Sequence, residues 1–485
     1  MDKKLKSKIL KGSASTSIGT ISGMIFQFFT IMILTRYVTK DDLGIYVLVL
    51  VIVNMFTLLG GLGVGLTMVK FIASKKKEEN RNILLPVLLI RAFGSLLFSL
   101  FFLLTAKHIL HFFDDRILQY GWYIIVIFIL ANYRDLFYQL MQGLNQFRQY
   151  SIVNVVSSVF RLFIVVLFLL FSNLDIRLLL IIEILSTVQP LIHQLLVIPF
   201  KKYLHIKPSW ETYKKIIKFS FPLYLNNLVV FINGRMNIFI IGAYLNPASI
   251  ANYDIARKMP TAFNKIYGSF IIVYFPNLAA LFSEENKKPA VNLIEKSVGL
   301  YSISMVFVVL FIFFFRNELT VLLYSELYAD VSLAFALLML NFFIAGLRSL
   351  ISYAFTPAGY PSVPVRINAF GSVISIGFSF LFIPIYGYMG AVYSLLIMNT
   401  ALTFLTYRYS VKYKINPKIK LFLKPIFLFF IAPLSLLFNE QNSLLLNSLM
   451  FIIALILGWI ISNEFRSIVE LVISYAKRFG IRHNS

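Results

Sequence analysis

Eight basic side chains lie inside long apolar stretches of this sequence. They are Arg91, Arg134, Arg161, Arg235, Arg257, Lys258, Lys265 and Arg348. A charged side chain at the centre of a membrane helix costs about 2.5–3.5 kcal/mol on insertion scales, so each must pair, reach an interface or line water. Arginine offers paired donors that match phosphate oxygens. These residues could therefore bind a phosphorylated or otherwise acidic ligand.

Acidic partners for these bases are few within the same stretches. The clearest are Asp135, Glu183 and Asp254, as candidates for charge pairing or for coupling to an ion. For Asp254 we expect a structural pair with Arg257 or Lys258 rather than proton coupling. Three acids against eight bases leave surplus positive charge, which predicts a cationic, water-filled cavity suited to a diphosphate or to acidic sugars.

Basic residues near the middle of an apolar stretch are stronger candidates for the cavity than residues near its ends. Arg161 and Arg235 lie near the middle of their stretches, whereas Arg134 and Lys265 lie closer to a membrane edge. Polar residues also recur at helical spacing, for example Asn132, Asp135 and Gln139. Such stripes either line a polar lumen or hold helices together by hydrogen bonds.

Signatures of enzymes and metal sites are missing from the sequence. It contains no cysteine, which excludes a thiolate ligand or a cysteine nucleophile. Walker, HExxH and GxSxG motifs are absent, so we expect no catalytic residue, no metal and no cofactor. His108 and His111 could indicate a membrane acyltransferase or sugar ligase, but histidines at a membrane interface are the commoner explanation.

The elements that must position these residues are membrane helices. The chain of 485 residues is 59% hydrophobic and 14% charged, whereas soluble domains carry about 25% charged residues. A span needs about 20 apolar residues. We predict an all-α polytopic membrane protein with about fourteen spans, at residues 14–35, 45–73, 83–105, 120–141, 151–171, 178–199, 217–243, 253–281, 298–315, 331–354, 367–383, 389–407, 425–438 and 444–461.

Loop charges give an orientation to these spans. If the N-terminus is cytoplasmic and the loops alternate, the cytoplasmic side carries 30 Lys and Arg residues and the other side carries 6. This asymmetry follows the positive-inside rule and predicts that both termini are cytoplasmic. It also explains most of the net charge of +24, which in a soluble protein would suggest nucleic-acid binding. We expect no nucleic-acid partner.

A weak internal repeat divides the chain. Residues 37–46 and 244–253 share a Tyr, an aliphatic residue, a polar turn and a second Tyr at the same spacing. Both segments follow the first helix of a six-helix unit, as in parallel transporter repeats. We predict lobes at 1–205 and 206–410, two additional spans within 411–462 and a cytoplasmic amphipathic tail at 463–485.

The N-terminal sequence resembles a known transporter family. Residues 13–48, SASTSIGTISGMIFQFFTIMILTRYVTKDDLGIYVL, lead into the glycine-rich LLGGLGVGL at 58–66. This pattern is similar to the bacterial oligosaccharide flippases, the Wzx-type exporters of the MATE-like (MOP) superfamily. The resemblance implies a substrate linked to undecaprenyl diphosphate, carried across the cytoplasmic membrane for capsule, O-antigen or exopolysaccharide assembly. Membrane lipids, a glycan polymerase and glycosyltransferases are the implied partners.

Three functions stay open at this point. The first is a flippase, in which the diphosphate–sugar head group enters a cationic cavity between the lobes and its lipid tail stays in the bilayer. The second is a MATE-type multidrug exporter, although the first span lacks the acidic residue typical of that branch. The third is an integral-membrane glycan polymerase or ligase.

Overall fold

In the computed structural model, the described residues are 3–73, 83–200, 203, 209–284, 286–419, 421, 444–461 and 466. Within these ranges the chain forms α-helices and short 3-10 turns, without any β-strand. It divides into two compact units, Met1–Asp254 and Ile255–Ser485. The predicted six-helix lobes at 1–205 and 206–410 stay a prediction.

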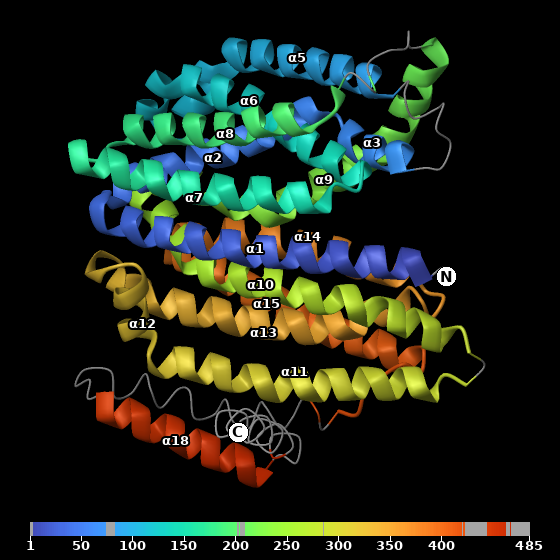
Figure 1. Ribbon diagram of the computed structural model, residues 1–485. Helices are drawn as coiled ribbons and strands as arrows, with labels where there is room; N and C mark the ends of the chain where they lie inside the picture. The colour runs from blue at the N-terminus through green and yellow to red at the C-terminus, as the bar shows by residue number, and fades with distance from the viewer. Residues whose placement is uncertain are drawn as a thin grey trace, which may run out of the picture. The chain divides into compact units, whose positions relative to one another are not determined.

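The first unit is a bundle of long helices that run side by side (Figure 1). Its elements are α1 (Lys3–Tyr37), α2 (Lys40–Gly61), α3 (Val64–Ala73), α5 (Leu84–His111), the 3-10 turn η1 (Asp115–Tyr120), α6 (Gly121–Gly143), α7 (Phe147–Phe171), α8 (Ile176–Val197), α9 (Trp210–Tyr244) and the start of α10 (Pro247–Phe282). Helix α1 packs mainly along α7, while α6 packs against α2, α3 and α8. Helix α9 lies against α2 and α3.

The second unit contains the rest of α10 and seven further elements. These are α11 (Lys288–Phe314), α12 (Arg316–Leu323), the 3-10 turn η3 (Glu326–Val331), α13 (Ser332–Phe355), α14 (Ser362–Tyr386), α15 (Tyr388–Lys412) and α18 (Leu444–Ile461). Helix α13 packs between α11 and α15, and α15 also packs along α14. The core of this unit is rich in phenylalanine, including Phe335, Phe342 and Phe355.

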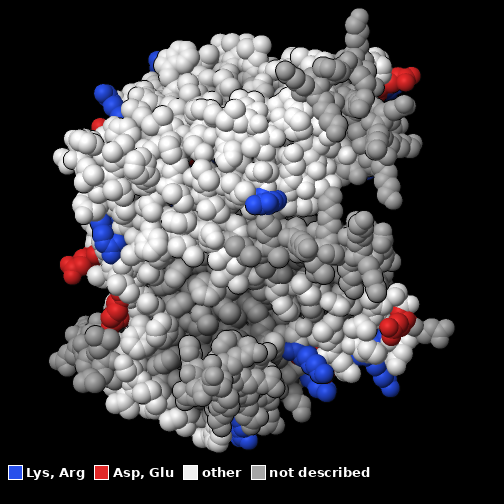
Figure 2. All heavy atoms as spheres, in the orientation of Figure 1, with Lys and Arg blue, Asp and Glu red and all other residues white. Residues whose placement is uncertain are grey.

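Eleven helices in the described ranges are long and apolar enough to cross a membrane, or twelve if the bent helix α10 counts as one span. Apolar side chains such as Leu96, Leu104 and Phe163 are exposed along them. Figure 2 shows that most of the visible surface of the described residues is uncharged. The prediction of an all-α polytopic membrane protein is confirmed.

The C-terminal predictions fall largely outside the described residues. This holds for the predicted span 425–438 and for nearly all of the predicted amphipathic tail at 463–485. Helix α18 matches the predicted span 444–461, and its apolar part is shorter than the other spans.

Polar caps and prolines explain several helix ends and bends. The side chains of Thr39, Asp175 and Ser209 accept hydrogen bonds from the first turns of α2, α8 and α9, which satisfies backbone donors that have no helical partner. Helix α10 bends by 44° between Gly268 and Val273. Pro276 explains this bend, because its ring clashes with the carbonyl four residues earlier and it donates no hydrogen bond.

The predicted span 45–73 is wrong in one respect, because the helix breaks in its middle. Leu62 and Gly63 adopt left-handed backbone angles, with φ of 48° and 69°. Helix α2 therefore ends at Gly61, and α3 starts again at Val64. Broken membrane helices of this kind occur where backbone lines a cavity or is buried in protein.

We expect Gly63→Ala to destabilise the protein by about 2 kcal/mol or more. A left-handed angle costs a residue with a Cβ about 1–2 kcal/mol, and this Cβ would lie 2.8 Å from the Ser220 carbonyl oxygen. Thermal unfolding of the purified protein in detergent measures the effect. The matched control is Gly377→Ala in α14, where a Cβ meets nothing within 4 Å. Equal melting temperatures for the two variants would contradict this account of the break.

Candidate functional site

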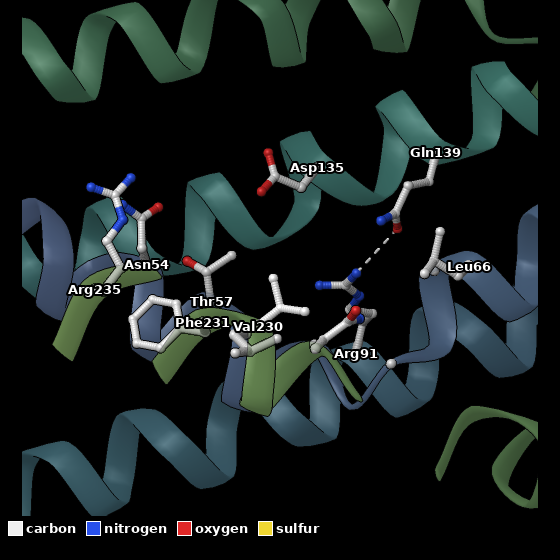
Figure 3. Close-up of a pocket in the computed structure, with 14 residues that line it drawn as sticks. Asn54, Thr57, Leu66, Arg91, Asp135, Gln139, Val230, Phe231 and Arg235 are labelled. Atoms are coloured by element: carbon white, nitrogen blue, oxygen red, sulfur yellow. Dashed lines mark hydrogen bonds between the residues drawn. The ribbon is translucent and has the colours of Figure 1, made fainter. Parts of the chain in front are cut away.

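A cavity of about 410 Å³ lies within the first unit, beside the break between α2 and α3. Its walls come from α2, α3, α5, α6 and α9 (Figure 3). The lining residues are Asn54, Thr57, Leu58, Gly61, Gly63, Gly65, Leu66, Arg91, Asp135, Gln139, Asn227, Val230, Phe231 and Arg235. Helices α2 and α6 each supply two polar side chains, α5 supplies Arg91, and α9 supplies two polar and two apolar side chains.

Arg91 is the buried cation of this cavity. Its side chain projects from α5 and only 5% of the residue is exposed. The guanidinium donates to the Asn132 side chain and, over 3.5 Å, to Gln139 Oε1. Asn132 in turn donates to Ser95 Oγ at 2.7 Å. Among the described residues, Arg91 Nε has no hydrogen-bond acceptor. The side chains that accept hydrogen bonds from this guanidinium are neutral, and the nearby Asp135 carboxylate attracts its charge.

The glycines at the break let Arg91 approach the backbone of α2. A Cβ on Gly61 would lie 2.9 Å from the Arg91 Nη1 atom. A Cβ on Gly65 would collide with Gln139. The glycine-rich sequence therefore serves close packing, and the side chains packed against Gly61 and Gly65 are polar residues of the cavity.

Arg235 supplies a second cation from α9. In Figure 3 it lies beside Asn54, at the opposite end of the cavity from Arg91, with Asp135 between the two arginines. Asp135 forms an ion pair with Arg134, at 2.9 Å. The charged residues of the lining are thus two arginines and one aspartate whose charge is already shared with a third arginine. The cavity is therefore electropositive.

Arg161, one of the two strongest cavity candidates from the sequence, lies in a different setting. It pairs with Glu183 of α8 at 2.7 Å and also donates to the Tyr46 hydroxyl. The Tyr46 hydroxyl donates to Glu183 at 2.5 Å. Glu183 is 7% exposed. This network joins α2, α7 and α8, and Arg161 does not line the cavity described above.

The other candidates belong to the second unit, except Asp254, and none of them lines this cavity. Arg257 and Lys258 are half-buried on α10, and Lys265 is exposed on the same helix. Arg348 of α13 donates to Asn368 Oδ1 at 3.2 Å. Asp254 is buried at the end of the first unit.

Three polar residues of the cavity were missed by the sequence analysis. They are Asn54, Thr57 and Asn227. Asn54 and Thr57 are three residues apart on α2, and Gly61 follows four residues later, so they form one helical stripe. This polar stripe in the sequence could have identified Asn54 and Thr57 as cavity residues.

Among the described residues, no group of three or more His, Cys, Asp or Glu side chains could hold a metal ion. The exposed His111 pairs with Asp115.

A family model for "Polysaccharide biosynthesis protein" matches residues 9–282. This match spans more than half of the chain and includes every residue of the cavity. The chain belongs to this family. No curated protein matches the sequence.

The fold of this polysaccharide biosynthesis protein is shared with solved transporters. One is the lipid II flippase MurJ in an inward closed conformation, with 16% identity, a TM-score of 0.71 and coverage of 94% of this chain and 99% of MurJ. Another is an inward-facing multidrug resistance MATE transporter of the MOP superfamily, with 15% identity, a TM-score of 0.65 and coverage of 82% and 94%. A MATE transporter of Vibrio cholerae, VcmN, has 14% identity, a TM-score of 0.57 and coverage of 84% and 97%.

These likenesses show that the chain has the same fold as solved MurJ and MATE transporters, which is the fold that the resemblance of residues 13–48 implied.

We expect Glu183→Gln and Arg161→Met each to destabilise the protein by about 3 kcal/mol. Each change leaves one member of a desolvated ion pair without its partner. The double variant should lose much less than the sum, because no unpaired charge stays behind. Thermal unfolding of the four proteins gives the coupling energy, and additive losses would show that the two side chains do not support each other.

Proposed function

We propose that this protein is a flippase for an oligosaccharide linked to undecaprenyl diphosphate. It moves this substrate from the cytoplasmic to the outer leaflet of the bacterial cytoplasmic membrane, for capsule, O-antigen or exopolysaccharide assembly. The family assignment supports a role in polysaccharide biosynthesis. One protein with the same fold is a lipid II flippase, which supports a lipid-linked substrate.

The observation that carries the proposal is the electropositive cavity inside a membrane-spanning bundle. Arg91 and Arg235 both line it. Arginine binds phosphate oxygens through two parallel hydrogen bonds and keeps its charge at any physiological pH. A diphosphate held there offsets the cost of keeping cations at membrane depth. The amide and hydroxyl groups of Asn54, Thr57 and Asn227 offer donors and acceptors suited to sugar hydroxyls.

Transport then proceeds by alternating access. The head group occupies the cavity while the lipid chain stays in the bilayer, so only the polar part has to cross. The loop charges support an orientation with both termini in the cytoplasm. Glycosyltransferases that build the oligosaccharide act before this protein, and a glycan polymerase acts on the exported unit.

A MATE-type multidrug exporter is the main alternative, because it has the same fold. The sign of the charge in the cavity disfavours it, since cationic drugs would be repelled by Arg91 and Arg235. Drug susceptibility of a deletion strain separates the two functions. A polymerase or ligase would instead leave unpolymerised repeat units already facing outward in such a strain.

We expect Arg235→Ala to lower glycan export by about ten- to a hundredfold. A hydrogen bond to a charged group contributes about 1.5–3 kcal/mol, which corresponds to that range. Surface glycan in a deletion strain complemented with each variant measures export, and immunoblotting of membranes measures the amount of inserted protein.

The matched control is Arg408→Ala, which removes an exposed arginine from α15, outside the cavity. Arg235→Lys keeps the charge but loses the paired donors, so its export should fall between wild type and Arg235→Ala. Normal export by Arg235→Ala at normal protein levels would refute the assigned site. Increased drug susceptibility of the deletion strain, with unchanged glycan, would favour the exporter.

A further inference from the structure

A second cavity, of about 440 Å³, lies on the other side of the α2–α3 break. We call it the apolar groove. It is lined by Leu62, Val64, Leu89, Ile90, Phe93, Tyr213, Ile217, Ser220, Phe221 and Tyr224. Residues of α5 and α9 supply most of its walls. The groove contains no charged side chain.

Successive residues at the break line the two cavities alternately. Gly61, Gly63 and Gly65 line the electropositive cavity, whereas Leu62 and Val64 line the apolar groove. This alternation is possible because the left-handed residues at 62 and 63 interrupt the helix. A continuous α-helix places residues two apart on different faces.

The neighbouring helices repeat the same division. On α5, Leu89 and Ile90 line the groove and the next residue, Arg91, lines the electropositive cavity. On α9, Tyr224 lines the groove and Asn227, one turn later, lines the cavity. A molecule with a charged head and an apolar tail therefore finds both surfaces next to each other.

One side of the groove is closed by a hydrogen bond between two helices, and the other side is exposed. Thr67 of α3 and Ser220 of α9 share a hydrogen bond of 2.7 Å, which joins the two helices behind the groove. Leu89, Phe93, Ile217 and Phe221 are each about half exposed or more. In a membrane-spanning bundle, such apolar side chains face lipid chains rather than water.

We propose that the apolar groove holds the part of the lipid carrier's hydrocarbon chain that is next to the diphosphate, while the diphosphate occupies the electropositive cavity and the rest of the chain stays in the bilayer. This inference rests on the proposed function and names the place where the substrate's tail lies. The groove lies along the first halves of α5 and α9, which start at the face that the loop charges predict to be cytoplasmic. The substrate thus approaches sideways from the inner leaflet.

The groove would bind the lipid chain through close packing rather than through the hydrophobic effect. Lipid chains of the bilayer are as apolar as the groove, so transfer of the tail from lipid to protein gains only packing. A chain held in the groove fixes the position of its diphosphate beside the break. Filling the groove with a large side chain should therefore weaken binding of a long-chain diphosphate without affecting a free one.

The test compares Leu89→Trp with Leu97→Trp. Both leucines are on α5 with 48% and 46% exposure, but only Leu89 lines the groove. Binding of undecaprenyl diphosphate and of inorganic pyrophosphate to the purified full-length protein is measured by calorimetry. We expect Leu89→Trp to weaken undecaprenyl diphosphate about tenfold and to leave pyrophosphate within about twofold, and Leu97→Trp to change neither.

A second pair protects the test against misfolding of one variant. Ile217→Trp fills the groove from α9, and Val229→Trp is its control on the same helix, with similar exposure. Equal effects of the groove and control variants would overturn the inference. So would competition by dioleoylphosphatidylglycerol as strong as that by undecaprenyl diphosphate, because the groove would then hold bulk lipid.

Failure of the proposed function gives a different result. If Arg235→Ala binds undecaprenyl diphosphate as tightly as wild type while Leu89→Trp does not, the assigned head-group site is refuted and the groove is retained. If Arg235→Ala binds weakly and Leu89→Trp binds normally, the head-group site is retained and the groove is refuted.

Discussion

A guanidinium group in the hydrocarbon layer of a membrane must be paired with an acid, hydrogen-bonded or in contact with water. Leaving its charge uncompensated costs several kcal/mol. The first unit contains both ion-paired and hydrogen-bonded arginines. Arg161 is paired with Glu183, Arg134 is paired with Asp135, and Arg91 is held by neutral side chains at the edge of a cavity. These contacts join α5 to α6, and they join α2, α7 and α8 to one another.

The break between α2 and α3 lies between two cavities of different character. Left-handed backbone at residues 62 and 63 brings glycines to one side and apolar side chains to the other. Because glycine has no side chain, Arg91 and Gln139 can lie against the backbone. The same few residues thus separate an electropositive cavity from an apolar groove. An amphipathic lipid-linked molecule needs both surfaces within a short distance of each other.

The fold alone does not distinguish a glycolipid flippase from a drug exporter, since solved proteins of both kinds share it. The sign of the charge that lines the cavity is the physical difference. Two arginines and an aspartate that already shares its charge with Arg134 line the cavity. In the proposed function this excess of positive charge attracts phosphate and repels cationic drugs. The ion-paired network of Tyr46, Arg161 and Glu183 contributes to the framework around the cavity rather than to its charge.

The sequence by itself determined the class of protein and most of its spans, because the length and apolarity of a membrane helix are local properties. It also determined that positive charge exceeds negative charge within the spans, and it placed Arg235 among the strongest candidates. Helical spacing shows which residues share a face, but not which helix lies opposite. Tyr46 is more than a hundred residues from Arg161 in the sequence, and Arg161 and Glu183 lie on separate helices. Only the tertiary structure therefore shows that Arg161 is paired with an acid. The break at Leu62 was equally hidden, because a glycine-rich stretch suits a closely packed straight helix as well as an interrupted one, and neighbouring helices decide between the two.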